Sequence, residues 1–270
     1  MVPNLLSIAG SDPSGGAGIQ ADLKTFAALG CHGMAVITAL TAQNTRGVGA
    51  IHAPPPEFLR AQINAIFEDI DVAAVKIGML GNAANVGIVA DRLTAFAPKF
   101  VVLDPVLAAT SGDSLGDAEV ASAIARLLLP LVDLVTPNAP EAARLTGLPE
   151  ASDLDGMRRL GEGLMAMGAR AVLVKGGHIP GADAQDLLLD RTGEMVFSAP
   201  WIKTHNTHGT GCTLSSAIAA YVAGGSALAE AIGKAKDYLT GALRESGTLS
   251  VGAGHGPVHH FWRARPKGPR

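Results

Sequence analysis

The 270-residue sequence contains little cysteine, few aromatic residues and few charges. The two cysteines, Cys31 and Cys212, form no spaced motif, so a disulfide scaffold is excluded and we expect a protein of the reducing cytoplasm. A net charge of −3 leaves no large basic footprint for nucleic acid. Every apolar run is shorter than the roughly 18 residues that span a bilayer, and the run at 5–9 lacks the charged start of a signal peptide. These absences favour a soluble globular protein.

Apolar residues and glycine are abundant instead. Hydrophobic residues make up 48% of the chain and 33 positions are glycine, a composition that favours a large core with tight loops and excludes a disordered chain. No linker or internal repeat divides the sequence, so we expect one domain over residues 1–262. The basic residues of 263–270 alternate with prolines and predict a frayed tail: Arg263, Arg265, Lys267 and Arg270.

Short apolar runs rich in valine and isoleucine alternate with segments of helical periodicity. Continuous apolar runs are typical of strands that helices cover on both faces. The predicted strands are 5–9, 34–40, 72–77, 100–103, 131–135 and 171–174, and the clearest helical stripes lie at 19–27 and 59–70. Residues 185–189 and 195–197, joined by a turn that contains glycine, predict an antiparallel hairpin. The pattern predicts an α/β fold with a mainly parallel sheet between helices.

Ligands of such folds bind at the carboxyl ends of the strands. The polar and glycine-rich loops expected there are 10–18, 41–45, 78–82, 104–113 and 206–212. The first of these loops matches neither the P-loop nor the dinucleotide-binding fingerprint. Its four glycines permit close approach of the backbone to a ligand, although a tight turn alone also explains some of them.

The segment 206–212 gives the strongest site signal, because it precedes a predicted helix at 214–222. Its small residues would leave the N–H groups of a helix N-terminus open to an anion. The helix dipole would stabilise a thiolate at Cys212, so this residue is a candidate base or nucleophile. A buried free cysteine that only packs as a small hydrophobe is an equally good interpretation.

Four further residues follow predicted strands. Asn138 and Glu141 have the spacing of a reciprocal helix cap, or of groups that hold a magnesium-bound water. Asp104 ends a strand where ligand-binding carboxylates occur, and Lys175 is placed to pair with phosphate or simply to end its strand. The histidines show no zinc-ligand spacing, and His205 and His208 lack a third ligand nearby, so we expect no zinc site.

Six segments, taken in order, resemble one known family: 8–22, 41–45, 76–80, 136–141, 174–178 and 208–213. They are similar to the bacterial hydroxymethylpyrimidine/phosphomethylpyrimidine kinases of thiamine biosynthesis, and residues 256–261 resemble the end of those enzymes. That family belongs to the ribokinase-like superfamily. The resemblance implies a three-layer α/β/α fold, ATP with Mg²⁺ as phosphoryl donor, and commonly a homodimer.

The resemblance also implies roles for individual residues. Gln43 would bind the aminopyrimidine ring in a pocket lined by Gly10, Ala17, Asp22, Met79 and Val106. Cys212 would act as general base where other ribokinase-like enzymes carry aspartate, and the N–H groups of Gly209, Thr210 and Gly211 would hold the transferring phosphoryl group. Lys175 and Thr207 would contact the nucleotide phosphates, and the Mg²⁺ ion would be managed by Asp104, Asn138 and Glu141.

The implied activity is phosphorylation of 4-amino-5-hydroxymethyl-2-methylpyrimidine and then of its monophosphate. A pyridoxal kinase is the nearest alternative, because it also phosphorylates a hydroxymethyl group on a heteroaromatic ring. A nicotinamide-dependent dehydrogenase is disfavoured by the missing fingerprint, and a non-catalytic pyrimidine-binding protein would leave Cys212 dispensable. Two positions depart from the resemblance: Thr110 stands where some relatives have lysine, and Cys31-His32 stands where an aromatic residue is expected.

Overall fold

The computed structural model of the chain describes residues 1–107, 118–177, 179 and 183–264. Within them the strands form one nine-stranded sheet of order β3-β2-β1-β4-β5-β6-β7-β8-β9. The six strands from β2 to β7 in that order pair in parallel, whereas β3, β8 and β9 are antiparallel to their neighbours. Their bounds are β1 (Asn4–Ser11), β2 (His32–Asn44), β3 (Gly47–His52), β4 (Ala74–Ile77), β5 (Val101–Leu103), β6 (Leu134–Val135), β7 (Ala171–Lys175), β8 (Asp183–Asp190) and β9 (Gly193–Pro200).

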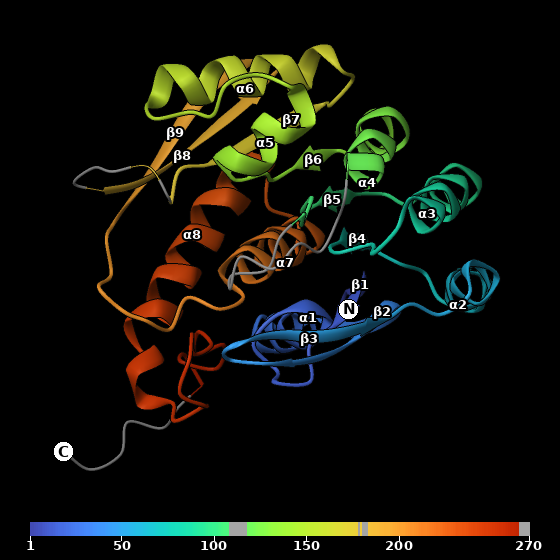
Figure 1. Cartoon of the computed structure of the whole chain (residues 1–270), viewed down its shortest axis with the longest axis horizontal. Coiled ribbons are helices and arrows are strands. Elements are labelled where there is room, and N and C mark those ends of the chain that lie inside the picture. Colours follow the sequence, from blue (N-terminus) through green and yellow to red (C-terminus); the bar gives the residue numbers. More distant parts are fainter. Residues whose placement is uncertain (108–117, 178, 180–182, 265–270) are drawn as a thin grey trace.

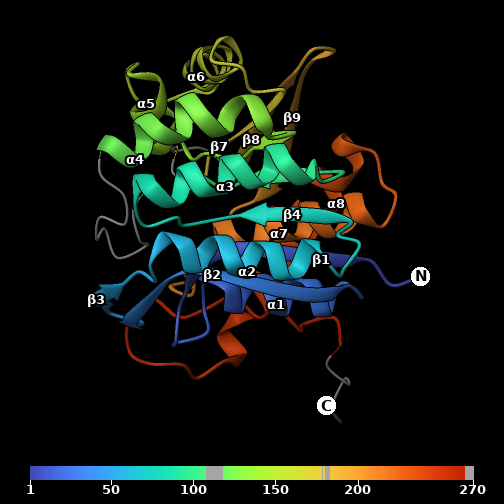
Figure 2. The same ribbon diagram turned by 90° about the vertical axis from the view of Figure 1, so that its right-hand side faces the viewer.

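Helices cover both faces of this sheet (Figure 1). One face carries α1 (Gly18–Ala28), α7 (Thr210–Ala223) and α8 (Leu228–Arg244), which pack together. The other face carries α2 (Pro56–Phe67), α3 (Ala83–Phe96), α4 (Ala118–Ala123), α5 (Ala139–Thr146) and α6 (Leu154–Ala166). Figure 2 shows α2 and α3 side by side on that second face. The three-layer α/β/α fold expected from the sequence is therefore confirmed.

Alternate side chains of the strands enter the two cores. Leu6 and Leu103 belong to the core under α2 to α6, whereas Leu5 and Val102 belong to the core under α1, α7 and α8. Because strand side chains alternate between faces, a strand buried on both faces must be apolar throughout. All four residues of β4 and all three of β5 are buried for this reason.

The structure corrects two of the expected elements. Residues 131–135 were expected as a strand, but Leu129–Leu131 forms a 3-10 turn around Pro130 and β6 is only Leu134–Val135. Residues 41–45 were expected as a loop, but β2 continues to Asn44 and turns into β3, which the sequence did not predict. This continuation exists because β2 and β3 pair as an antiparallel hairpin, with an irregularity between Ala42 and Gln43.

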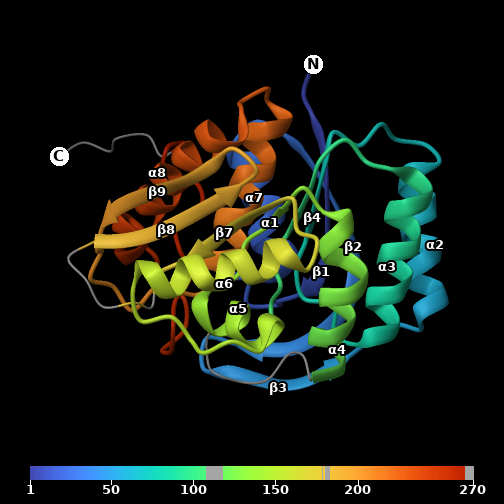
Figure 3. The ribbon, with the colours of Figure 1, turned by 90° about the horizontal axis from the view of Figure 1, so that it is seen from above.

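The second hairpin, β8–β9, is present as expected and lies beside α8 (Figure 3). At the carboxyl end of the described chain, the guanidinium of Arg263 lies 5.0 Å from the Trp262 ring and 5.6 Å from the Tyr238 ring. Arg263, which we assigned to a frayed tail, therefore packs on the domain, and residues 265–270 lie outside the described part of the chain. None of the described helices combines the length and apolar character needed to cross a membrane.

Candidate active site

A cavity of about 630 Å³ opens at the carboxyl ends of the central strands. Its walls come from the ends of β1 and β2, the loops after β4, β5, β6 and β7, and the start of α7. Of the predicted site residues, all but Asp22 line it: Gly10, Ala17, Gln43, Met79, Asp104, Val106, Asn138, Glu141, Lys175, Thr207, Gly209, Thr210, Gly211 and Cys212. A volume of this size suits a small-molecule or nucleotide site. The chain thus brings residues from seven separate segments to one place.

One end of the cavity contains the residues expected around the ring. A Cβ at Gly10 would lie 2.6 Å from Met79 Cε, so only glycine lets the methionine pack across the end of β1. The Thr38 hydroxyl donates to the Met79 carbonyl oxygen over 2.6 Å and holds this loop against β2. Gln43 is partly buried on β2 and exposes its amide to the cavity.

The helix α7 begins beside this ring end. Gly209 is its N-cap residue with φ +81°, a conformation that favours glycine, and a Cβ there would overlap the Gly16 carbonyl oxygen. Cys212 is the third residue of the helix, so free backbone N–H groups and the thiol share one end of α7. The loop therefore leads into a helix start as the sequence predicts, and anion binding by residues 206–212 stays a prediction.

The thiol of Cys212 is not stabilised as a thiolate in this ligand-free structure. Burial raises its pKa to about 11, and Asp22 and Asp104 add to the rise, whereas the Lys76 ammonium and the Gly18 N–H lower it. Burial therefore outweighs the dipole of α7, on which the expectation of an activated thiolate rested. With a pKa raised to this extent, Cys212 carries its proton at neutral pH.

Two carboxylates and a lysine form the charged part of the cavity. Lys175 Nζ lies 2.7 Å from Asp104 Oδ1 and 4.0 Å from Glu141 Oε2. Burial raises the pKa of Glu141 to about 7, while the charge of Lys175 lowers it and that of Asp104 raises it. Lys175 itself has a raised pKa, because Asp104 and Glu141 outweigh the effect of its burial.

Asn138 and Glu141 form a helix cap and also line the cavity. The Asn138 side chain accepts from the Glu141 N–H and Glu141 Oε2 accepts from the Asn138 N–H, both over 2.8 Å, which is a capping box at the start of α5. The capped carboxylate nevertheless lines the cavity. Hard oxygen donors of this kind fit Mg²⁺, and no group of three His, Cys, Asp or Glu side chains in the described residues gathers around a metal position. Water and phosphate oxygens would complete the shell, as Mg²⁺ commonly requires.

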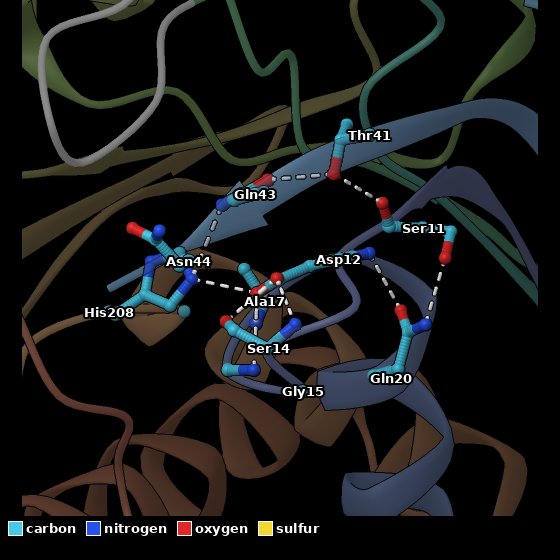
Figure 4. Close-up of polar contacts among 12 residues, drawn as sticks. Ser11, Asp12, Ser14, Gly15, Ala17, Gln20, Thr41, Gln43, Asn44 and His208 are labelled. Carbon is cyan, nitrogen blue, oxygen red and sulfur yellow. Dashed lines mark hydrogen bonds and ion pairs between the residues drawn. The ribbon is translucent and has the colours of Figure 1, made fainter. Parts of the chain in front are cut away.

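The pair of Asp12 and His208 is a feature that our sequence reasoning missed. His208 is 6% exposed, and its Nε2 lies 2.7 Å from Asp12 Oδ2 (Figure 4). Asp12 also accepts from the N–H groups of Ser14, Gly16 and Ala17, so this one side chain organises the first glycine-rich loop. The aspartate next to the glycines was the available signal, but its partner lies 196 positions away.

Asp22 is placed differently from the expectation. Its side chain has no exposure and lies beneath the cavity, where it pairs with Lys76 over 2.9 Å and accepts from the hydroxyls of Ser7 and Ser216. Lys76, which was not predicted, contributes to the cavity wall. A single charged residue inside the apolar run of β4 was the signal that would have found it.

The carboxyl-terminal segment anchors the anion-binding loop from outside. The His208 N–H donates to the Gly256 carbonyl oxygen over 3.0 Å, and Thr213 Oγ1 lies 3.1 Å from His260 Nε2. The Tyr238 hydroxyl donates to the His260 carbonyl oxygen over 2.5 Å and so holds His260 in turn. The similarity of residues 256–261 to the family thus has a structural counterpart.

The remaining predicted positions lie away from the chemistry or outside the described residues. His205 is exposed, Cys31 is a free, partly buried cysteine beside α1, and His32 begins β2. Thr110 is among the residues that the structure does not describe. Opposite the ring end, the wall of the cavity becomes apolar: Pro200, Trp201, Ile202, Leu214, Leu239 and Leu243.

Comparison with known proteins supports a kinase. A family profile described as phosphomethylpyrimidine kinase matches residues 12–259. The hydroxymethylpyrimidine/phosphomethylpyrimidine kinase of Rhizobium meliloti is 53% identical over 96% of this chain and 97% of its own length. The structure of a phosphomethylpyrimidine kinase from Clostridium difficile superposes with a TM-score of 0.78 at 42% identity, covering 89% of this chain and 98% of that one.

A pyridoxal kinase has a similar structure at lower identity. The ADP complex of the Bacillus subtilis pyridoxal kinase has a TM-score of 0.89 at 35% identity and covers 98% of this chain and 99% of that one. The fold is therefore ribokinase-like, shared by both kinds of vitamin kinase. With the family profile and half-identical relatives matching along nearly its whole length, the chain belongs to the hydroxymethylpyrimidine/phosphomethylpyrimidine kinases of thiamine biosynthesis.

Proposed function

We propose that this chain uses ATP to phosphorylate the hydroxymethyl group of 4-amino-5-hydroxymethyl-2-methylpyrimidine, and then the monophosphate to the diphosphate. The observation that carries the proposal is the single cavity that joins Gln43, the start of α7 and an apolar end. The first would bind the ring, the second the transferring phosphoryl group, and the third the adenine. Membership of the family supports the same activity.

At the ring end, the Gln43 amide would bond the edge of the aminopyrimidine, since an amide both donates and accepts. Met79, Ala17 and Val106 would contact the faces and the methyl group of the ring. Gly10 supports this pocket by leaving room for Met79. Asp22 acts through Lys76 instead of touching the ring, because it lies beneath the cavity.

At the start of α7, Cys212 would accept the proton of the substrate hydroxymethyl group. The hydroxyl oxygen then forms a bond to the γ-phosphorus of ATP, and ADP leaves with the electrons of the broken bond. The N–H groups from Gly209 to Cys212 would hold the phosphoryl oxygens as negative charge develops on them. The Lys76 ammonium and the Gly18 N–H oppose the effect of burial, which raises the pKa of Cys212 to about 11.

On the nucleotide side, Lys175 would leave Asp104 to contact phosphate oxygens, with Thr207 beside it. Asp104, Asn138 and Glu141 would hold Mg²⁺, partly through water, as their oxygen donors and burial suit. When bound, the ion would neutralise phosphate charge. The residues of this chain would orient the phosphates.

A coupled ADP-release assay tests this function with the pyrimidine alcohol, its monophosphate and pyridoxal side by side. We expect kcat/KM to be highest for the two pyrimidines. Cys212→Ala should lower kcat by orders of magnitude with a similar substrate KM, and Gln43→Leu should mainly raise the pyrimidine KM, about tenfold for one lost hydrogen bond. Unchanged turnover in Cys212→Ala would remove the general base from the proposal.

Pyridoxal phosphorylation is the second candidate function. It is favoured by the TM-score of 0.89 with a pyridoxal kinase, against 0.78 with the phosphomethylpyrimidine kinase. A kcat/KM that favours pyridoxal in the same assay would replace the first candidate with this one. The homodimer and the cytoplasmic location stay predictions, which sedimentation equilibrium and cell fractionation test.

A further inference from the structure

A row of polar contacts crosses the ring end of the cavity and passes through the amide of Gln43 (Figure 4). At one end the Thr41 hydroxyl donates to the Ser11 carbonyl oxygen over 2.8 Å. Thr41 Oγ1 lies 3.1 Å from Gln43 Oε1, and Gln43 Nε2 lies 3.4 Å from His208 Nε2. At the other end His208 Nε2 lies 2.7 Å from Asp12 Oδ2. The amide is thus held from both sides.

The two ends of the row have fixed proton positions. The Thr41 hydroxyl has one proton, and the Ser11 carbonyl can only accept it, so Thr41 Oγ1 is left to accept from Gln43. Burial raises the pKa of Asp12, but the hydrogen bonds from His208, Ser14 and Ala17 lower it by more, so that the pKa falls to about 2. A carboxylate only accepts, so His208 Nε2 carries a proton and cannot accept from Gln43.

These fixed ends decide the orientation of the amide. A glutamine amide occupies nearly the same volume after a half-turn about its last bond, and its hydrogen-bond partners determine which orientation is stable. With nitrogen toward His208, one contact has two donors and the other has no proton to share. With nitrogen toward Thr41, the amide donates to Thr41 Oγ1, and its oxygen faces the Nε2–H of His208 as the longer, 3.4 Å branch of a bond shared with Asp12, so no contact sets donor against donor or acceptor against acceptor.

We propose that Thr41 and the Asp12–His208 pair fix the amide of Gln43 in this second orientation and thereby set which ring edge the enzyme accepts. They are positioning residues, because they act through Gln43. The inference rests on the proposed function, since it assumes that Gln43 contacts the substrate ring.

The fixed order of donor and acceptor suits an aminopyrimidine. The 4-amino group donates and the neighbouring ring nitrogen accepts, so an amide of one orientation pairs with both at once. Its oxygen retains a second lone pair and its nitrogen a second proton for this purpose. Pyridoxal has an aldehyde, whose oxygen only accepts, beside its hydroxymethyl group where the pyrimidine has its amino donor, so the amide oxygen meets no donor at that place. An amide free to turn would discriminate less between the two rings.

The orientation of the His208 imidazole ring is held by its surroundings. A Cβ at Gly16 would overlap the His208 ring, so the ring packs directly on the glycine-rich loop. The backbone of His208 is held by Gly256, and its side chain is 6% exposed. A rigid imidazole on one side and a hydroxyl bonded to the backbone on the other give the amide a preorganised setting.

The test uses paired variants, with KM and kcat measured for the pyrimidine alcohol and for pyridoxal. Thr41→Val and His208→Leu should each raise the pyrimidine KM about tenfold, with smaller effects on kcat and on the KM for ATP. Thr41→Ser and His208→Gln keep an oxygen or an N–H donor near the original place and should recover most of the affinity. The preference for pyrimidine over pyridoxal should fall in the first two and return in the second two.

Gln20→Leu is the matched control. Gln20 accepts from the Asp12 N–H and donates to Ser11 Oγ, both over 2.8 Å, but it is not among the described residues that line the cavity. Removing it alters the same loop without touching the amide of Gln43. We expect the ring preference of this variant to equal that of the wild type.

Double variants with Gln43→Leu separate positioning from general support. If Thr41 and His208 act only through Gln43, then adding Thr41→Val or His208→Leu to Gln43→Leu should leave the pyrimidine KM unchanged. Additive effects would overturn the inference, as would an unchanged ring preference in both Thr41→Val and His208→Leu. Wild-type enzyme without pyrimidine turnover would instead contradict the proposed function itself.

Discussion

Lys76 and Asp22 form an ion pair in which neither side chain is exposed to solvent. Because removal of one member leaves a buried charge uncompensated, we expect Asp22→Asn and Lys76→Met each to lower the free energy of unfolding by about 3–5 kcal/mol. Urea denaturation at neutral pH measures this. The double variant Asp22→Asn/Lys76→Met should lose less than the sum of the two single losses; strictly additive losses would show that the two charges do not interact.

A substitution at Glu141 can distinguish its role in the helix cap from its proposed role in binding Mg²⁺. Glu141→Gln keeps an acceptor for the Asn138 N–H, so α5 should remain capped and the melting temperature should change little. If the carboxylate also holds Mg²⁺, the Mg²⁺ concentration for half-maximal activity should rise about tenfold, because one hard charged donor is lost. An unchanged Mg²⁺ dependence would assign Glu141 to the cap alone. Asp153→Asn, which keeps the cap of α6 at a position that does not line the cavity, is the control.

The raised pKa of Cys212 predicts a pH dependence of stability. A cysteine thiol of pKa 9.0 in the unfolded chain is deprotonated at lower pH than the folded thiol, whose pKa is about 11. Between these values the folded state binds more protons, so stability should fall as pH rises from about 9 to about 11. The fall should be shallower in Cys212→Ala. Ultraviolet titration of thiolate absorbance, wild type against variant, gives the pKa directly.

Gly209 should tolerate no side chain. Gly209→Ala places a Cβ at φ +81° and against the Gly16 carbonyl oxygen, so we expect it to destabilise the fold by about 1–2 kcal/mol. Displaced N–H groups at the start of α7 should lower kcat by about 100-fold. Gly87→Ala is the control, because open space surrounds that position on α3; it should retain activity and gain roughly 0.5–1 kcal/mol of stability. Equal activity of the two variants would contradict this role of Gly209.

The fold was largely predictable because its signals are local. The apolar runs of the central strands indicate burial on both faces of the sheet, and the small residues of 206–212 indicate the start of a helix. The strand β3 gave no such signal, because most of its residues are exposed and it exists only through pairing with β2. The strand expected at 131–135 begins only at Leu134, because a 3-10 turn around Pro130 occupies its start, and the apolar pattern does not show this turn.

The candidate site was predictable as a set of loops but not as a set of partners. The resemblance identified residues most of which line the cavity, but it does not say how deeply each side chain is buried. Asp22 was therefore assigned to the pocket, although its side chain lies beneath the cavity wall. Asp12 and His208 come from opposite ends of the chain, and only the folded sheet brings them together. The effect of burial on Cys212 likewise depends on its neighbours in space.

Anchoring of His208 by Gly256 and of Thr213 by His260 has a consequence for synthesis of the protein. The sheet and the ring pocket are built from residues that precede Gly256 in the chain, whereas these two contacts need Gly256 and His260. A nascent chain would therefore hold its first glycine-rich loop in place well before the loop at the start of α7 is secured. Catalytic competence would follow only after residue 260 has been synthesised, when most of the described fold already exists.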